Sequence, residues 1–304
     1  MKSRISVVIP VYNGAHVIAE QLRALDRQEN MPEFEVIISD NGSTDNLREV
    51  ISAISTSYDV RIVDSSMKQG ICTARNVGVQ YACGELIIFC DADDYVDPGF
   101  VAGHWEAYQK YPRSIIAGSL VYSAVNSPEQ LEAYGINPAK EPDNLGYKTR
   151  EDLHPYSGYL PSVAGCNFSV PTDIYLEVGG MDSSYIGGSE ETDFTWRVLN
   201  AGYDIVSTSK PRVNYALRST ARSIYKQQLK YQLNKVLLWE RFKDRGMTGP
   251  SVKYSLLSVL RSLPALLQQK TRKKAAYTLG GNVGALQGIW TYRILKKIPE
   301  RELM

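Results

Sequence analysis

The sequence predicts an α/β protein in which helices cover both faces of a parallel β-sheet. Short apolar runs rich in β-branched residues alternate with stretches of helical periodicity in the first third of the chain. Strands that are apolar without interruption are buried on both faces, which is typical of parallel sheets with helical crossovers. The hydrophobic content of 43% and the charged content of 22% are those of an ordinary globular protein. With 304 residues, the chain can form one large domain or two smaller ones.

Four strands alternate with three helices in the first part of the chain. Each strand is a short apolar run that leads into Asn, Asp or Gly, residues that favour turns. We expect strands at residues 5–10, 34–39, 60–63 and 86–90, and helices at residues 15–28, from 44 or 45 to about 55, and 73–82.

The second part of the chain is less regular. A strand is expected at residues 114–122, and residues 127–157 form a long excursion rich in Pro, Asn, Tyr and charge. Residues 163–170, 174–178 and 187–201 return to compact structure and end in a helix. Beyond residue 213 the pattern is mainly helical, with one helix at 224–245 and two or three over 252–297, broken by Pro264 and by Gly280-Gly281.

Charge is distributed unevenly, although the formal net charge is only +1. Residues 218–304 hold 18 Lys and Arg against 4 Asp and Glu, which leaves 16 basic and 29 acidic residues in residues 1–217. The four cysteines lack metal-ligand spacing, which favours a reducing compartment. The apolar run at the start favours a buried strand over a signal peptide, and no apolar stretch approaches the ~20 residues of a membrane span.

Polar residues directly follow three of the predicted strands. They are Tyr12-Asn13 after the first, Asp40 with residues 43–45 after the second, and residues 91–94 after the fourth. Ligands of parallel sheets bind just past the carboxyl ends of the strands. We therefore expect these side chains to converge on one crevice.

The sharpest candidate site is the segment FCDADD at residues 89–94, where a buried strand leads straight into carboxylates. In continued strand geometry, Asp91 and Asp93 would point the same way, about 6.6 Å apart at ~3.3 Å per residue. Two such oxygen ligands suit Mg²⁺ or Mn²⁺ and a bound diphosphate. The alternative is an acidic turn that caps the next helix, because Asp and Pro98 both favour turns.

Two further polar positions suit a nucleotide. Asp40 at a strand end could accept N3–H of uracil or thymine, or N1–H of guanine, and it does not choose among them. Its alternative role, or that of Asn41, is to support the turn through side-chain hydrogen bonds. Arg75 places a cation in a Gly-led loop that enters a helix, and the alternative is an arginine on the helix surface.

A second acidic cluster is the segment GGSEETDF at residues 187–194. Beside such a crevice, its acids could supply a general base and a second group that holds a substrate. The alternative is an ordinary helix start, since Ser189 can cap a helix and acids in its first turn complement the dipole. Because Glu190 and Glu191 are adjacent, we expect only one of them to face the crevice.

Other chemistries fit the sequence poorly. The three histidines share no metal-ligand spacing, no Gly-x-Gly-x-x-Gly follows the first strand, and no phosphate-binding GK[ST] occurs. Hydride transfer and P-loop hydrolysis are therefore disfavoured. A nucleotidyltransferase would need a Gly-rich basic loop after the first strand, and VYNGAHVI lacks one.

Taken together, these segments resemble the family 2 glycosyltransferases with the GT-A fold. The resemblance covers roughly residues 4–215 through VVIPVYNG, SDNGSTDN, GICTARNVG, FCDADD, AGCNFSV with VGGMD, and GSEETDFTWRVLNAG. It implies a mixed, mostly parallel sheet flanked by helices, with a C-terminal helical extension. Residues 1–215 would be the catalytic domain, with a nucleotide-binding half at 1–110 and an acceptor-binding half at 111–215, and residues 216–304 the basic extension.

The resemblance also implies a role for each matching residue. Asp93 would bind Mn²⁺ or Mg²⁺ at the diphosphate, Asp91 would contact the ribose or the metal shell, and Glu191 would be the base of an inverting transfer. Asp193 is the second choice for the base. The substrate-binding set would be Pro10, Tyr12, Asn13, Asp40, Asp45, Gly70, Arg75, Asn76, Asp91, Glu190, Trp196 and Arg218.

Two departures from the family pattern bear on these roles. The family usually has Glu-Asp where this chain has Glu190-Glu191, so the base is one methylene longer. Many relatives carry a late histidine near the metal, and no histidine follows His154. Water would then complete the metal shell, or Arg218 and Arg222 would hold the diphosphate.

The basic tail resembles a subset of the family with a Tyr-x-x-Arg segment, here Tyr215 to Arg218, and a Gln-rich helix at Gln227-Gln228. Leucines at residues 256–267 beside Arg261 and the basic residues 270–274 predict either an amphipathic surface for anionic membrane or a helix packed on the catalytic domain.

The expected function is transfer of a sugar from a nucleoside-diphosphate sugar, UDP ahead of dTDP and GDP, to a carbohydrate or lipid-linked acceptor. The setting would be bacterial polysaccharide, glycolipid or glycoconjugate synthesis, in the cytoplasm or on the inner face of the membrane, and no nucleic acid partner is expected. The alternative is a non-catalytic nucleotide-sugar-binding protein that docks on membranes.

Overall fold

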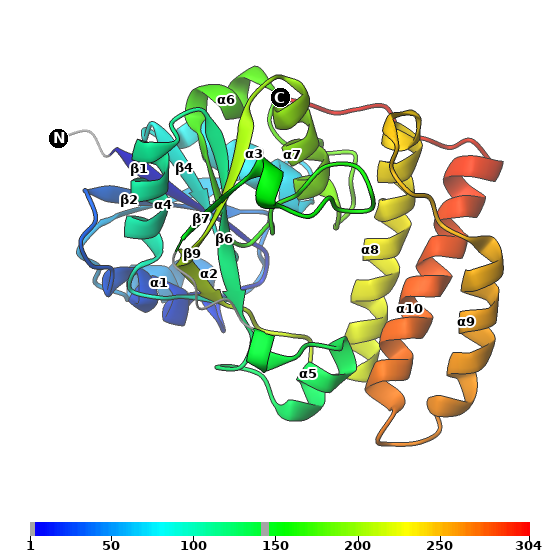
Figure 1. Cartoon of the computed structure of the whole chain (residues 1–304). Coiled ribbons are helices and arrows are strands. Elements are labelled where there is room, and N and C mark those ends of the chain that lie inside the picture. The colour runs from blue at the N-terminus through cyan, green and yellow to red at the C-terminus, as the bar shows by residue number, and fades with distance from the viewer. Residues whose placement is uncertain (1–3, 141–145) are drawn as a thin grey trace.

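The computed structural model describes residues 4–140 and 146–304. Residues 1–3 and 141–145, the latter within the expected excursion at 127–157, lie outside the described residues. Figure 1 shows an α/β body, coloured blue to yellow-green, with a helical extension in yellow to red at its side. Within the described part of the chain, no helix has both the length and the apolar character needed to cross a bilayer.

A nine-stranded sheet forms the centre of the body in the described residues, in the order β3-β2-β1-β4-β8-β6-β9-β5, with β7 paired to β9. β1 is parallel to β2 and β4, and β2 is parallel to β3. β8 runs antiparallel to β4 and β6, whereas β6 and β9 are parallel. The strands are β1 (Ile5–Val11), β2 (Phe34–Asp40), β3 (Asp59–Asp64), β4 (Leu86–Phe89), β5 (Tyr95–Val96), β6 (Ser114–Val121), β7 (Tyr147–Thr149), β8 (Phe168–Pro171) and β9 (Asp204–Asn214).

Helices cover both faces of this sheet, as the apolar strands predict. Along β1, the side chains of Ile5, Val7 and Ile9 belong to the core cluster that includes α1, α2 and α4, whereas Val8 belongs to the cluster of α3, α6 and α7. This alternation follows from the two-residue period of a strand. The helices are α1 (Ile18–Asp26), α2 (Leu47–Ser52), α3 (Ile71–Tyr81), α4 (Phe100–Lys110), α5 (Pro128–Tyr134), α6 (Thr172–Glu177) and α7 (Glu190–Asn200).

Several elements differ from the sequence prediction. The helices expected from residues 15 and 44 or 45 begin at Ile18 and Leu47, and the excursion at 127–157 contains α5 and β7. β9 was not predicted, because Pro211 interrupts its pattern. The register between β6 and β9 shifts at Ala117/Ser119, and this irregularity accommodates a residue that cannot donate to the ladder.

The extension consists of α8 (Ala221–Phe242), α9 (Val252–Ala265) and α10 (Arg272–Gly288), followed by a π-helix, η4 (Ile289–Ile294). The expected break at Gly280-Gly281 is wrong, since both glycines lie inside α10. Gly280 and Gly284 instead face α8, where an added Cβ would lie 2.4 Å from the carbonyl oxygen of Tyr225 and 2.2 Å from that of Leu229. Glycine is needed there because the two helices approach so closely.

Candidate active site

Two adjoining cavities lie past the carboxyl ends of β1, β2 and β4. The smaller, of about 390 Å³, is lined by Pro10, Tyr12, Asn13, Asp91 and Asp93. The larger, of about 1420 Å³, extends between the body and α8 and is lined by Gly70, Arg75, Glu190 and Glu191, among others. Both share Tyr12, Asn41, Ile71, Asp91 and Arg218. The predicted convergence on one crevice holds for Tyr12, Asn13, Asp91 and Asp93, whereas Asp40 and residues 43–45 are not among the lining residues of either cavity in the described structure.

The loops after β1 and β2 are tied together at the rim of the smaller cavity. Asn13 has a positive φ of 52°, accepts a hydrogen bond from Thr44 N–H at 2.8 Å and donates its own N–H to Ser43 Oγ at 2.9 Å. Asp45 accepts from Ala15 N–H at 2.9 Å and is exposed. In the described structure Asp45 therefore holds the rim and lies outside both cavities.

The turn after β2 uses Asp40 and Asn41 differently. Asp40 is buried and accepts from Ser43 N–H at 2.8 Å, the turn-supporting bond that the sequence offered as an alternative. Asn41 lines both cavities, donates to the carbonyl oxygens of Ser65 and Lys68, and accepts from Gly70 N–H at 2.6 Å. Asn41 thus fixes the Gly70 loop, where φ of 152° suits glycine.

The strand β4 ends at Phe89, and residues 91–94 form a turn. The strand geometry on which the 6.6 Å spacing was based therefore does not extend to these residues, because β4 ends before Asp91. Asp93 lies at the surface of the crevice and pairs with Arg218, whose Nη1 is 3.2 Å from Oδ2. Asp91 pairs with Arg75 at 3.0 Å.

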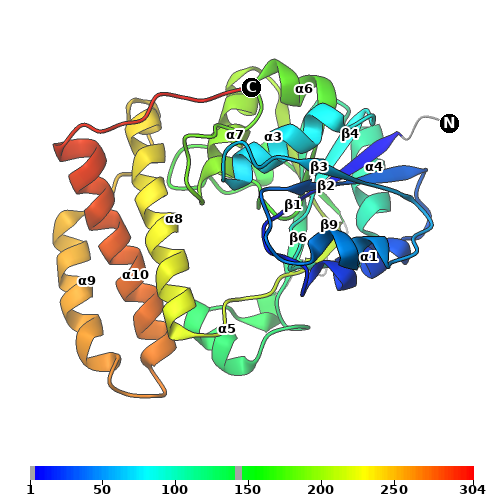
Figure 2. The same cartoon turned by 180° about the vertical axis from the view of Figure 1, so that it is seen from behind.

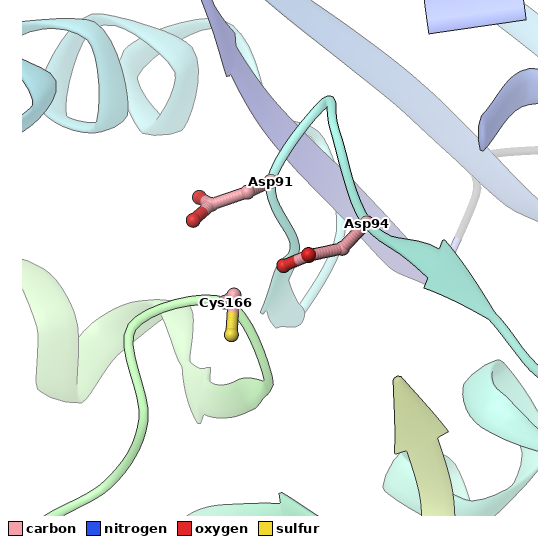
Figure 3. A group of neighbouring side chains, drawn as sticks. All are labelled: Asp91, Asp94 and Cys166. Carbon is pink, nitrogen blue, oxygen red and sulfur yellow. The ribbon is translucent and has the colours of Figure 1, made fainter. Parts of the chain in front are cut away.

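The third carboxylate of this turn, Asp94, received no role from the sequence. It is 1% exposed, accepts from Ala216 N–H at 3.0 Å, and its second oxygen has no hydrogen-bond partner among the described residues. Burial first, and the charge of Asp91 second, raise the pKa of Asp94 to about 8. Figure 3 shows Asp91 and Asp94 directed to the same side of the turn, near Cys166, with potential ligand atoms within 4.8 Å of one another.

The donor atoms of this turn fit a hard cation. Carboxylate oxygens are what Mg²⁺ and Mn²⁺ prefer, and Asp91 and Asp93 both reach the smaller cavity. The Cys166 thiol is a soft ligand whose pKa is raised well above its ordinary value, chiefly by burial. It is a poor partner for such an ion at neutral pH.

Arg75 joins the two acidic clusters. The residue is 1% exposed, donates to Asp91 and to the carbonyl oxygen of Gly165 at 2.9 Å, and lies 3.6 Å from Glu190. Burial works against its charge, but the charges of Asp91 and Glu190 outweigh it and raise the pKa of Arg75. Arg75 thus lines the larger cavity while it is held between two carboxylates.

The start of α7 presents the adjacent glutamates unequally. Gly187, Gly188 and Ser189 all have positive φ, and Gly188 N–H donates to Glu190 Oε2 at 2.6 Å. Burial, and next the neighbouring charge of Glu190, raise the pKa of Glu191 to about 8. Glu191 lines the larger cavity and is poised to exchange a proton near neutral pH.

Three expected site residues have structural positions instead. Asp193 is fully buried and pairs with Arg197 at 2.7 Å and Arg301 at 2.8 Å, so it cannot serve as a base in the crevice. Trp196 lies in the core and donates its indole N–H to the carbonyl oxygen of Leu160 at 3.0 Å. Asn76 is buried, accepts from Tyr175 Oη at 2.6 Å and donates to Met181.

The sequence missed the aromatic wall of the larger cavity. This wall combines tyrosines with the cations of α8, and the residues concerned are Tyr122, Tyr134, Tyr156, Tyr215, Tyr231, Tyr277, Lys226 and Lys230. These residues are spread over six regions of the chain, and of them only Tyr215 belongs to a motif named from sequence, the Tyr-x-x-Arg segment. His16, one of the three histidines without metal-ligand spacing, lines the smaller cavity.

The sheet contains both parallel and antiparallel strand pairs, and carboxylates lie just past the ends of its parallel strands. This arrangement is typical of α/β proteins that bind a ligand at that edge of the sheet. The sequence model of glycosyl transferase family 2 matches residues 6–171, more than half of the chain. The chain therefore belongs to glycosyl transferase family 2.

Curated relatives and solved structures agree with this membership. Glycosyltransferase AglE of Haloferax volcanii is 26% identical over 203 residues, which cover 66% of this chain and 63% of AglE. Validoxylamine A glucosyltransferase of Streptomyces hygroscopicus subsp. limoneus is 28% identical, with 64% and 47% covered. The chain thus spans less than two thirds of the length of these relatives.

Among solved structures, the mannosyltransferase PcManGT of Pyrobaculum calidifontis, in complex with GDP-Man and Mn²⁺, has a TM-score of 0.65 at 15% identity. The match covers 95% of this chain and 88% of that one. At this level of identity the likeness shows the fold, and the body has the GT-A fold.

Proposed function

We propose that this protein is an inverting glycosyltransferase that moves a sugar from a nucleoside-diphosphate sugar to an acceptor hydroxyl. The observation that carries the proposal is that two acidic clusters, the turn at 91–94 and the start of α7, face one crevice and are joined by Arg75. Residues 1–110 would hold the nucleotide, and residues 111–215 together with α8 would hold the acceptor.

Each cluster has a distinct part in the reaction. Glu191 takes the proton of the acceptor hydroxyl while that oxygen forms a bond to the anomeric carbon. The bond from this carbon to the diphosphate breaks on the opposite face, which inverts the configuration and releases a nucleoside diphosphate. Asp93 and Asp91 would hold Mn²⁺ or Mg²⁺, which supplies charge to offset that of the leaving group. Arg218, between both cavities, adds a positive charge at the same place.

The donor is a nucleoside-diphosphate sugar, and we expect UDP ahead of dTDP and GDP. Support for this class comes from structural neighbours of similar fold, PcManGT with GDP-Man and Mn²⁺ and S. aureus TarS with UDP. TarS has a TM-score of 0.55 at 16% identity and covers 97% of this chain. Since the two neighbours bind different nucleotides, the base has to be determined directly.

The acceptor is expected to be a carbohydrate or a lipid-linked carbohydrate, in the synthesis of a bacterial polysaccharide, glycolipid or glycoconjugate. The tyrosines of the larger cavity offer apolar ring faces and hydroxyl groups to sugar rings. Lys226 and Lys230 of α8 are exposed in the same cavity and give its outer part a positive charge. An acceptor that bears a phosphate would suit this charge.

Contact with the inner face of the cell membrane is part of this proposal. In and just after α9, the side chains of Tyr254, Leu256, Leu260, Leu263 and Leu267 are exposed by 48 to 84%. Residues 245–299 contain ten Lys and Arg and no Asp or Glu. α9 packs on α10 at the outer side of the extension, away from the body (Figure 1). An apolar face with a basic surround fits an anionic bilayer surface.

A thermal-shift screen tests the donor class. UDP-, GDP- and dTDP-sugars with Mn²⁺ should raise the melting temperature of the purified protein for one base in preference to the others. Release of the corresponding nucleoside diphosphate should then require both the metal and an acceptor. If no donor binds, or if release proceeds equally without divalent metal, the proposal fails.

The second candidate is a protein that binds a nucleotide sugar without turnover. This candidate is favoured by residue 191, which is a glutamate where the family usually has an aspartate. The side chain is one methylene longer, so its carboxylate lies further from the backbone. Glu191→Asp separates the two candidates: a transferase retains measurable nucleoside-diphosphate release in one or both forms, whereas a binding protein releases none in either.

Vesicle sedimentation tests the membrane contact. The protein should sediment with vesicles of phosphatidylglycerol and phosphatidylcholine, but not with phosphatidylcholine alone. Leu260→Asp should reduce sedimentation, and Leu176→Asp, at an exposed leucine of α6, should not. Equal sedimentation of the two variants would contradict a role for α9.

A further inference from the structure

The last residues of the chain cross from the extension back to the catalytic body. After η4 the backbone runs over the end of α8 and finishes beside α6 and α7, as the red segment in Figures 1 and 2 shows. We call residues 299–304 the C-terminal strap. The extension is thereby joined to the body at both of its ends, through the segment before α8 and through the strap.

The strap is fixed to the loop at 179–184 by backbone hydrogen bonds. Ser183 N–H donates to the carbonyl oxygen of Glu302 at 2.9 Å, and Met304 N–H donates to that of Gly179 at 2.8 Å. Glu302 N–H in turn donates to Asp182 Oδ1 at 3.0 Å. A Cβ at Gly180 would lie 2.5 Å from the sulfur of Met304, so the strap fits closely against this loop.

Arg301 carries the charge that links the strap to the catalytic helix. Its Nη1 lies 2.8 Å from Asp193 and 3.3 Å from Asp182, two carboxylates with no exposed surface. Asp193 also pairs with Arg197 of α7 and Asp182 with Arg241 of α8, each at 2.7 Å. One network thus connects α7, α8 and the strap.

The start of α7 depends on such contacts because its cap is weak. Ser189, the N-cap residue, has a φ of 69°, and in the described structure its side chain makes no capping hydrogen bond. The first N–H groups of a helix have no intrahelical partners, so side chains usually fix this turn. Here buried ion pairs hold residues on both sides of Glu191: Glu190 lies 3.6 Å from Arg75, and Asp193 pairs with Arg197 and Arg301.

We propose that Arg301 is a positioning residue for glycosyl transfer: through Asp193 it holds the first turn of α7 and with it the carboxylate of Glu191. The inference rests on the assignment of Glu191 as the base. It predicts that loss of Arg301 displaces the base while the donor cavity, formed by the loops after β1, β2 and β4, stays intact.

Arg301→Met should lower kcat by roughly 10- to 100-fold, because small misplacements of a catalytic group cost this much. The KM for the donor should stay within about twofold. Arg301→Lys should restore part of kcat, since an ammonium group can reach one of the two carboxylates. Lys297→Met is the matched control, because Lys297 is exposed in the same terminal segment and no ion pair is found for it among the described residues.

Backbone hydrogen exchange supplies a readout that does not need turnover. In Arg301→Met, amides of residues 187–196 should exchange faster than in the wild type, whereas those of β1 and β2 should not. The inference would be overturned by unchanged exchange at α7 or by a kcat equal to that of the wild type. It would also be overturned if the fraction of Arg301→Met molecules able to bind nucleoside diphosphate fell as much as kcat, because the variant would then be misfolded as a whole. If the wild type itself lacks turnover, the proposed function fails, and exchange at α7 still reports whether Arg301 holds the helix.

Discussion

Two carboxylates of the crevice, Asp93 in the turn at 91–94 and Glu191 at the start of α7, have different surroundings. In the turn at 91–94, Asp93 lies near solvent with Arg218 at 3.2 Å, so its charge has a cationic partner. At the start of α7, Glu191 lies against Glu190, and burial raises its pKa to about 8. A carboxylate at the surface of the crevice suits a hard cation, and one that exchanges a proton near neutral pH suits a base. The difference in surroundings, more than the residue type, separates the roles.

The largest expected effect follows from removing the cation-holding side of this comparison. Asp93→Ala should lower kcat/KM by about 10³-fold or more, since the charge of the leaving diphosphate would lose its main counterion. Release of nucleoside diphosphate measures the loss. Asp59→Ala, at an exposed position of β3, is the control and should leave the rate unchanged. Undiminished turnover in Asp93→Ala would remove the turn at 91–94 from the reaction.

Removing the base side should have a somewhat smaller effect. Glu191→Gln should lower kcat by roughly 10²- to 10⁴-fold, the usual contribution of a general base, with donor binding retained. Only the ionised carboxylate accepts a proton, so kcat/KM of the wild type should fall as pH decreases below about 8, where the free Glu191 becomes protonated. The pH profile of kcat/KM is the measurement. A flat profile from pH 6 to pH 9 would exclude Glu191 as the base, and Glu132→Gln on the surface of α5 is the control.

The sequence predicted the parallel part of the fold well because apolar strands and turn residues carry local information. Strands β1, β2, β3, β4 and β6 lie where their apolar runs predict. β9 was missed because its pairing with β6 is a long-range contact that tolerates Pro211 at an irregularity. The close approach of α8 and α10 was missed for a similar reason. Gly280 favours a helix break in the local sequence, and only the contact with α8 shows that glycine is needed inside α10.

Within the site, the sequence predicted which segments meet but not how each side chain is used. FCDADD and GSEETD both reach the crevice, yet Asp193 and Trp196 of α7 point into the core. A helix start with several acids leaves open which of them faces the cavity, because that depends on packing against other elements. Asp193 pairs with Arg301, which is more than 100 residues away in sequence, so its burial could not be predicted from the local pattern.

Arg218 tests whether the two sides of the crevice are coupled through the donor. Arg218→Ala should raise the donor KM by about tenfold and lower kcat less, because the arginine is half exposed and its pair with Asp93 is screened. Steady-state kinetics with varied donor provide the measurement. Arg222→Ala is the matched control, since sequence put both arginines forward but only Arg218 lines the cavities. An equal change in both variants would indicate a general effect of positive charge around the start of α8.

The smallest expected effect is on the free energy of unfolding. It tests the burial of Glu191 independently of its role as a base. Its pKa of about 8 in the folded protein lies above the ordinary value of 4.5, so folding retains a proton that the unfolded chain loses between these values. Stability from the neutral form is therefore fully present below pH 4.5 and is lost as pH rises through 8. Glu191→Gln should avoid this loss and exceed the wild type in free energy of unfolding at pH 9 by roughly 1 to 3 kcal/mol, the order of the cost of removing a polar group from water. Urea unfolding at pH 5 and pH 9 measures the difference. Identical unfolding curves for the two proteins at pH 9 would mean that solvent reaches Glu191 freely. The different roles of Asp93 and Glu191 would then have to follow from where each carboxylate lies in the crevice, and not from its burial.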